Sequence, residues 1–254
     1  MRLLILLTIV LQLFETAAAD PPQGSDQTAN STDIRTLPAK TLNDHFPFKV
    51  PDDGGAWHAR SETLRRRILV ATGLWPMPTK TPLQAKVYGK TERDGFSIEK
   101  VHFQSLPGHY VTGLLFRPTA NFETPRPGVL CPHGHGGRMQ SHSDAELASQ
   151  ISQGAEHFEE SGRTPKIARC VQLARMGCVS FIFDMLGYED SVQVSYKAAH
   201  RHQDPRPEEA KPTRDGWIFY SPEADHRCQS IMGLQTWNAI RSLDFLESLP
   251  DVNG

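Results

Sequence analysis

The chain has 254 residues, of which 38% are hydrophobic and 22% charged, and its formal net charge is −2. This mixed composition is typical of a globular protein and excludes fibrous and largely disordered classes. Because acidic and basic residues nearly balance, the sequence lacks the excess of basic residues that is typical of nucleic-acid-binding proteins. We therefore expect no nucleic-acid partner.

Residues 1–19 are typical of a secretory signal peptide. Arg2 supplies the positive charge, and Leu3–Phe14 is an apolar run that is too short to span a bilayer. Ala17–Ala19 provides the small residues of a cleavage site. We expect residues 20–43, which are rich in Pro, Gln, Ser, Thr and Asp, to form a disordered leader. After cleavage the protein would be secreted or periplasmic, with no membrane partner.

Residues 44–126 are expected to hold an N-terminal helix and antiparallel strands. Helical spacing of apolar residues predicts a helix over Ala56–Leu74. Apolar and polar residues alternate over Phe96–Phe103, and Tyr110–Phe116 is a second strand candidate after the turn residues Pro107 and Gly108. The pair predicts an antiparallel hairpin or meander at the edge of a sheet.

Residues 127–254 are expected to form an α/β core. Gly128–Cys131 and Cys178–Asp184 are nearly continuous apolar runs of the kind found in buried parallel strands. The pattern of Lys166–Met176 predicts a helix between them, so the three segments form a right-handed crossover.

Four further segments complete this core region. Met139–Pro165 is polar and too long for a simple connection, so it is either a short helix with loops or part of the wall of a site. Val192–Arg227 is expected to be an excursion above the sheet. Cys228–Leu249 has the widest apolar stripe of the chain and predicts a helix, and Asp251–Gly254 is expected to be a turn.

The mature chain has four cysteines, which allow three disulfide pairings. The strand positions of Cys131 and Cys178 place these two at opposite ends of parallel strands, beyond the reach of a disulfide. We expect mostly buried free thiols.

The rest of the chain is organised around Pro127–Arg138, whose sequence is PGVLCPHGHGGR. A buried strand here ends in a glycine-rich loop. Such a loop presents backbone N–H groups at the carboxyl edge of a sheet, where open α/β folds bind their ligands. Glycines let the backbone bend sharply and approach a ligand closely. The sequence therefore predicts a functional site at this loop.

Asp184 ends the second parallel strand and could belong to the edge of that site. A carboxylate at this position also fixes turns through bonds from its side chain to the backbone. The second interpretation is the better supported of the two.

Several stretches together resemble the α/β-hydrolase superfamily, and within it the secreted acetyl xylan esterase and dienelactone hydrolase-like branch. They are Arg93–Pro118, His133–Gly137, Phe183–Ser191 and the terminal helix closing in SLPDVNG. The resemblance implies a mostly parallel sheet with antiparallel N-terminal strands. It also implies a serine nucleophile, no cofactor and no metal. The implied substrate is a small-molecule or polysaccharide ester, acetyl groups on polysaccharide being one candidate.

In this family the oxyanion is held by backbone N–H groups from the residue after the nucleophile and from the loop after the third strand. The resemblance makes His135 and Gly136 the expected donors, with His133, Gly134 and Gly137 supporting the loop. His133 would brace the loop rather than act as the base, because in this fold the histidine follows the serine and the acid along the chain.

The sequence departs from the family in one respect, since G-x-S-x-G occurs nowhere in it. The nucleophile should follow the next strand, so no member of the triad is expected within the chain. We expect a chain truncated before the nucleophile strand, with the triad beyond Gly254 and no esterase turnover of its own.

Two alternatives remain open. His133 and His135 could present two imidazoles to zinc, as in a metal-dependent hydrolase, although Gly136 and Gly137 are better explained by an oxyanion loop. A hydrolase fold without its serine could instead be a non-catalytic binding module.

Overall fold

The computed structural model describes residues 36–38, 43–45, 48–120, 125–200 and 229–253. The predicted signal peptide, nearly all of the predicted leader and most of the predicted excursion at 192–227 lie outside these ranges. The chain divides into two units, residues 1–50 and 51–254. Every helix and strand below belongs to the second unit.

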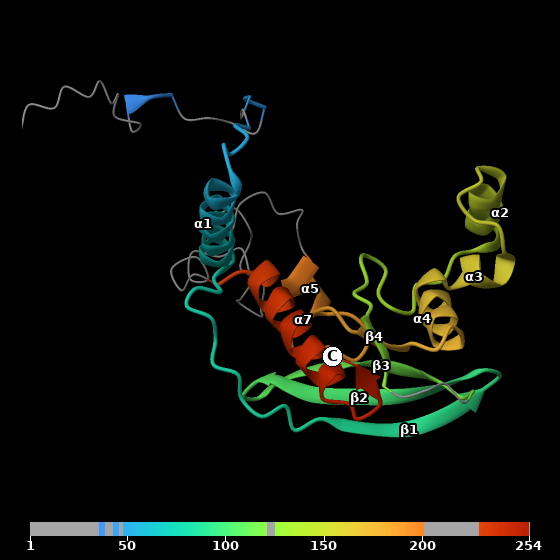
Figure 1. The fold of residues 1–254 in the computed structure, drawn as a ribbon. Coiled ribbons are helices and arrows are strands. Elements are labelled where there is room, and N and C mark those ends of the chain that lie inside the picture. The colour runs from blue at the N-terminus through green and yellow to red at the C-terminus, as the bar shows by residue number, and fades with distance from the viewer. Residues whose placement is uncertain (1–35, 39–42, 46–47, 121–124, 201–228, 254) are drawn as a thin grey trace, which may run out of the picture. The chain divides into compact units, whose positions relative to one another are not determined.

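A six-stranded mixed sheet forms the centre of this unit, in the order β1-β2-β3-β5-β4-β6 (Figure 1). The pairs β1–β2, β2–β3 and β3–β5 are antiparallel, whereas β4 pairs in parallel with both β5 and β6. The predicted α/β class is therefore correct. The strands are β1 (Lys86–Arg93), β2 (Phe96–Leu106), β3 (His109–Pro118), β4 (Arg126–Leu130), β5 (Val179–Phe183) and β6 (Val252–Asn253).

The three predicted helices are present, and a side chain caps the start of two of them. Asp53 accepts the N–H of Ala56 at 2.7 Å at the start of α1, and Gly73 ends it at φ 77°. Ser230 accepts the N–H of Gly233 at 2.9 Å at the start of α7. The helices are α1 (Gly54–Thr72), α2 (Asp144–Ser152), α3 (Glu159–Arg163), α4 (Pro165–Arg175), α5 (Tyr196–His200) and α7 (Ile231–Glu247).

Two elements differ from the sequence-based expectation. β1 was not predicted, because all eight of its residues are exposed and no apolar alternation marks it. The expected turn at Asp251–Gly254 is wrong in part, since Val252 and Asn253 pair with Arg126 and Pro127 of β4. Met139–Pro165 contains α2 and α3, as the first of its two interpretations proposed.

Two apolar clusters cover opposite faces of the sheet. Phe181 and Phe183 of β5 pack with α7, whereas Ile182, between them, packs with Cys170 and Ala174 of α4. Alternate residues of a strand point to opposite faces, so α7 and α4 lie on different sides. All five residues of β5 are buried, as expected for a strand covered on both faces. The expectation that β4 is also buried is wrong, since none of its five residues is buried.

Two smaller findings concern cysteines and membranes. Cys131, Cys170 and Cys178 are free thiols, as expected, and the first two are buried; Cys228 lies outside the described residues. Within the described ranges, no helix combines the length and the apolar character that crossing a membrane requires.

Phe181 offers a test of this core. Its side chain is fully buried, and its ring lies 6.3 Å from Phe103 and 5.1 Å from Phe245, measured between centroids. We expect Phe181→Ala to lower the free energy of unfolding by about 3–5 kcal/mol, because it removes transfer energy and leaves a cavity. Met176→Ala, at a side chain that is 66% exposed, is the control and should change it by less than about 0.5 kcal/mol. Urea unfolding curves that superimpose for the two variants would contradict this view of the core.

Candidate active site

The glycine loop (His133–Gly137) and the segment after β5 meet at one edge of the sheet. The N–H of Cys131 donates to the carbonyl of Phe181 at 2.8 Å, which continues the parallel pairing to the end of β4. The glycine loop leaves β4 directly after this bond, and Asp184 leaves β5 beside it. The predicted site residues are therefore brought together at the carboxyl edge, where open α/β sheets bind ligands.

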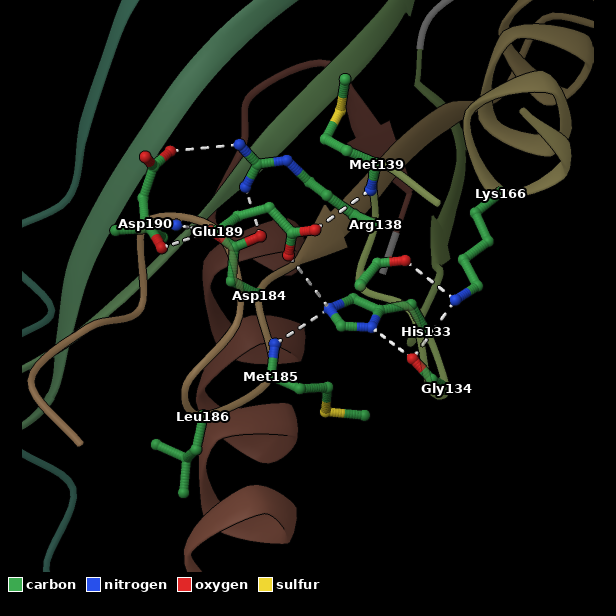
Figure 2. A network of polar contacts seen from close by, with 12 residues as sticks. His133, Gly134, Arg138, Met139, Lys166, Asp184, Met185, Leu186, Glu189 and Asp190 are labelled. Carbon is green, nitrogen blue, oxygen red and sulfur yellow. Dashed lines mark hydrogen bonds and ion pairs between the residues drawn. The ribbon is translucent and has the colours of Figure 1, made fainter. Parts of the chain in front are cut away.

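His133 braces this edge with both of its ring nitrogens (Figure 2). Nδ1 lies 2.9 Å from the carbonyl oxygen of Gly134, and Nε2 accepts the backbone N–H of Met185 at 3.1 Å. Since an N–H can only donate, Nε2 is unprotonated and Nδ1 carries the proton. Burial lowers the pKa of His133, which favours the same neutral form. The ring is held between two segments of backbone and is not a free base.

Lys166, at the start of α4, holds the carbonyl groups of the glycine loop. Its Nζ lies 3.2, 2.5 and 2.8 Å from the carbonyl oxygens of Gly134, His135 and Gly137. One turn further along, Arg169 donates to the carbonyl of Pro132 at 3.0 Å. The carbonyl and N–H of a trans peptide point in opposite directions. The N–H groups of His135 and Gly136 therefore point away from Lys166, on an exposed stretch of the loop.

Tyr188 packs beside the glycine loop. Burial and its interaction with Tyr196 raise the pKa of Tyr188, and the backbone of Gly136 lowers it in part. The Tyr188 ring also packs edge-on against His133, with centroids 5.3 Å apart. Sequence reasoning missed Tyr188, although it lies within the FDMLGYEDS stretch.

The glycines of the loop are not equivalent. Gly136 and Gly137 have φ values of 83° and 71°, which L side chains rarely adopt. A Cβ on Gly137 would also lie 2.0 Å from Oε1 of Glu189, whereas a Cβ on Gly134 would meet no atom within 4 Å. The backbone path thus requires glycine at position 137 and not at position 134.

Asp184 joins the two segments through a buried ion pair. Its side chain is almost fully buried and pairs with Arg138, which also binds Oδ2 of Asp190 at 3.1 Å. The second carboxylate oxygen of Asp184 accepts the hydroxyl of Thr112 at 2.6 Å and the N–H of Asp190 at 3.3 Å. Burial raises the pKa of Asp184, and the Arg138 guanidinium opposes that shift. These are the turn-fixing bonds expected of Asp184, and they leave neither oxygen free to act on a substrate.

Glu189 is a second residue that the sequence did not reveal. It adopts a left-handed backbone conformation at φ 42°, and its Oε1 accepts the N–H of Met139 at 3.2 Å. Its buried Oε2 has no hydrogen-bond partner among the described residues and lies 3.9 Å from Nε2 of His133. The side chain therefore fills the space beneath the glycine loop.

A metal fits this site poorly. Within the described part of the chain, His133, Asp184 and Glu189 offer ligand atoms within 4.8 Å of one another, and His135 is not in the group. However, Nε2 of His133 already accepts a backbone N–H, and Asp184 faces the Arg138 guanidinium. A cation would have to break these bonds and lie beside a fixed positive charge. The donor set does not support a metal at this position.

No family model and no curated protein matches the sequence. Solved structures do match. Methylesterase BT1017 is 21% identical with a TM-score of 0.50, over 80% of this chain and 35% of that chain. A protein of Bacteroides fragilis NCTC 9343 (BF1801), described as a candidate acetyl xylan esterase, is 14% identical with a TM-score of 0.52, over 81% of this chain and 47% of that chain.

The fold is the α/β-hydrolase fold. The likeness to these two structures confirms the fold expected from the sequence. In the described part of the chain, however, the sheet is mixed rather than mostly parallel, because three of its five strand pairs are antiparallel. At such identities the likeness concerns the fold alone. The chain spans less than half the length of each of these two structures.

Substitution of the two glycines tests the geometry of the loop. We expect Gly137→Ala to lower the midpoint of thermal unfolding by several degrees, because the methyl group would collide with Glu189 and the backbone would be strained. Gly134→Ala, a matched change three residues earlier, should leave the midpoint within about one degree. Equal midpoints for the two variants would show that the loop follows a different path.

The neutral state of His133 predicts a pH dependence. Its pKa is lower in the folded chain than the usual value of about 6.5, so below pH 6.5 the unfolded state binds a proton that the folded state excludes. The stability that this histidine contributes is thus present above pH 6.5 and is lost as the pH falls toward the folded pKa.

We expect the free energy of unfolding of the parent to fall more steeply from pH 7.5 to 5.5 than that of His133→Gln, measured by urea titration. Other titrating groups are common to both proteins and cancel in the difference. Parallel pH profiles would rule out a buried neutral His133.

Proposed function

We propose that this chain is the N-terminal part of a serine esterase whose oxyanion hole includes the N–H groups of His135 and Gly136. The observation that carries the proposal is the set of hydrogen bonds from the Lys166 ammonium to three carbonyl oxygens of the glycine loop. It directs the N–H groups of His135 and Gly136 away from α4, at the edge where α/β folds bind ligands. The printed names of the two matching structures, a methylesterase and a candidate acetyl xylan esterase, support ester hydrolysis as the reaction class.

The proposed chemistry follows from this arrangement. A serine hydroxyl attacks the ester carbonyl carbon, and the carbonyl oxygen gains the negative charge of a tetrahedral intermediate. The N–H groups of His135 and Gly136, with the N–H after the nucleophile, stabilise that oxygen without having to reorient. Collapse of the intermediate releases the alcohol, and water then hydrolyses the acyl-enzyme.

The residues that perform the proton transfers are proposed to lie beyond Gly254. The sequence contains no G-x-S-x-G, and it covers only 35% and 47% of the two structures named above. His133 is not proposed as the base, because both of its nitrogens are bonded to backbone groups. Its role is to fix the distance between the glycine loop and the segment after β5.

The substrate and the compartment are part of the same proposal. The signal-peptide pattern of residues 1–19 supports a secreted or periplasmic enzyme. An ester on a small molecule or on a polysaccharide, with acetyl groups as the first candidate, suits that location. No cofactor is required by this mechanism.

The proposal is tested with the product of the complete natural reading frame, expressed beside residues 20–254. We expect a fluorophosphonate probe to label the longer protein at one serine and to leave the shorter chain unlabelled. The longer protein should hydrolyse 4-nitrophenyl acetate. As a check on the glycine loop, Lys166→Met should lower its kcat by about 10- to 100-fold with little change in KM, because the N–H groups stabilise the transition state.

Two outcomes would contradict the proposal. If the longer protein takes up no probe and hydrolyses no ester, the serine mechanism fails and a non-catalytic binding module becomes the better interpretation. If Lys166→Met retains the full kcat, the serine assignment stands but the glycine loop is not the oxyanion hole.

A further inference from the structure

A groove lies over the antiparallel part of the sheet, outside the site described above. Its volume is about 450 Å³. Side chains from β1, β2, β3 and the segment after β5 line it, and three of them carry aromatic rings. The principal lining residues are Tyr88, Lys100, His102, Tyr110, Thr112 and Asp190.

The register of the strands places this groove at the same edge of the sheet as the glycine loop. Gly113 of β3 lies opposite Phe183, the last residue of β5, and the two strands are antiparallel. The first residues of β3 therefore extend past the carboxyl end of β5, where the N–H of Asp184 donates to the carbonyl of Thr112 at 2.8 Å. His102 lies opposite Thr112, and Tyr88 opposite Lys100, so β2 and β1 continue the same edge.

The groove lies on the face of the sheet against which α4 packs. Tyr110 and Thr112 alternate in phase with Leu114 and Phe116, which pack against the cluster of α4. On the same face, the side chains of Tyr110 and Thr112 line the groove. Antiparallel strands can leave one face open in this way, whereas the central strand β5 is buried along its whole length.

The chemistry of the lining suits a sugar chain. The Tyr88 and Tyr110 side chains are 50% and 39% exposed, and both lie edge-on to His102, with centroids 5.5 and 6.2 Å away. A pyranose ring presents a flat C–H face, which packs on aromatic rings, and a rim of hydroxyl groups, which need donors and acceptors. The Tyr hydroxyls, the Lys100 ammonium and the Asp190 carboxylate supply them around the rings.

The groove is joined to the glycine loop by direct bonds. Asp190 pairs with Arg138 at 3.1 Å, and Thr112 donates to Asp184 at 2.6 Å. A ligand that lies across Tyr88 and Tyr110 would thus end beside the segments that carry the proposed oxyanion hole.

We propose that this groove binds two or three pyranose units of a glycan chain next to the ester-cleaving site. Its role as a substrate subsite rests on the proposed function, but binding itself needs no triad. The Lys100 ammonium makes no ion pair within the described ranges and is available to a sugar carboxylate.

The test measures binding to the product of the complete natural reading frame by isothermal titration, with two probes. Xylo-oligosaccharides are the neutral probe and oligogalacturonates the acidic one. We expect Tyr88→Ala and Tyr110→Ala to weaken binding at least fivefold, while Tyr88→Phe, which keeps the ring, should stay within twofold of the parent. Lys100→Met should weaken only the acidic probe.

Trp57→Ala is the matched control, because Trp57 is 51% exposed on α1, away from the groove lining. It should bind as the parent does. The proposal is overturned if neither probe binds, or if Tyr88→Ala and Tyr110→Ala, folded by their thermal midpoints, bind as tightly as Trp57→Ala.

These outcomes are separable from the test of esterase activity. Binding that depends on Tyr88 in a protein without esterase activity would leave the groove standing as a glycan site and reject the hydrolase proposal. Hydrolysis of 4-nitrophenyl acetate without glycan binding would support the hydrolase proposal and reject the glycan site.

Discussion

The contact on which the site depends is the one between the Lys166 ammonium and three carbonyl oxygens of the glycine loop. A loop with two residues at positive φ has no regular hydrogen bonding to fix its peptide planes. Lys166 supplies that constraint from outside the loop, and Arg169 extends it to Pro132. The position of Lys166 depends in turn on the packing of α4, through Cys170 and Ala174, against the sheet. The direction of the N–H groups is thus tied to the hydrophobic core.

A second constraint holds the opposite side of the edge. The buried pair of Arg138 and Asp184 joins the residue after the glycine loop to the end of β5. Taking two charges out of water costs free energy that their attraction only partly offsets, so such a pair is weak evidence for stability. Its effect here is geometric, because Thr112 and the N–H of Asp190 complete the bonding of the same carboxylate. The His133 ring also joins these two segments, because Nδ1 bonds to the carbonyl of Gly134 and Nε2 accepts the N–H of Met185.

The sequence allowed prediction of those parts of the fold that have their own apolar pattern. α1, α4 and α7 were found from helical spacing, and β4 and β5 from apolar runs. β1 was missed because its residues are exposed, so its pairing depends on backbone bonds that leave no trace in composition. The glycine loop was located from Gly136 and Gly137, whose positive φ values explain why glycine occurs there. Lys166, Tyr188 and Glu189 could not be predicted, because each reaches the loop only through the topology, and a left-handed glutamate has no sequence signal.

The same topology explains why a groove can exist beside the loop. A parallel strand is reached through a crossover helix, and that helix covers one of its faces, so β5 offers no open surface. Antiparallel strands joined by tight turns need no such helix, and β1–β3 accordingly keep the Tyr88–His102–Tyr110 rings uncovered. Because β3 runs antiparallel to β5, the open part of its face lies at the carboxyl edge rather than at the far end of the sheet. A small ester could reach the glycine loop without touching these strands, whereas an extended substrate placed at this edge would find its surface on them.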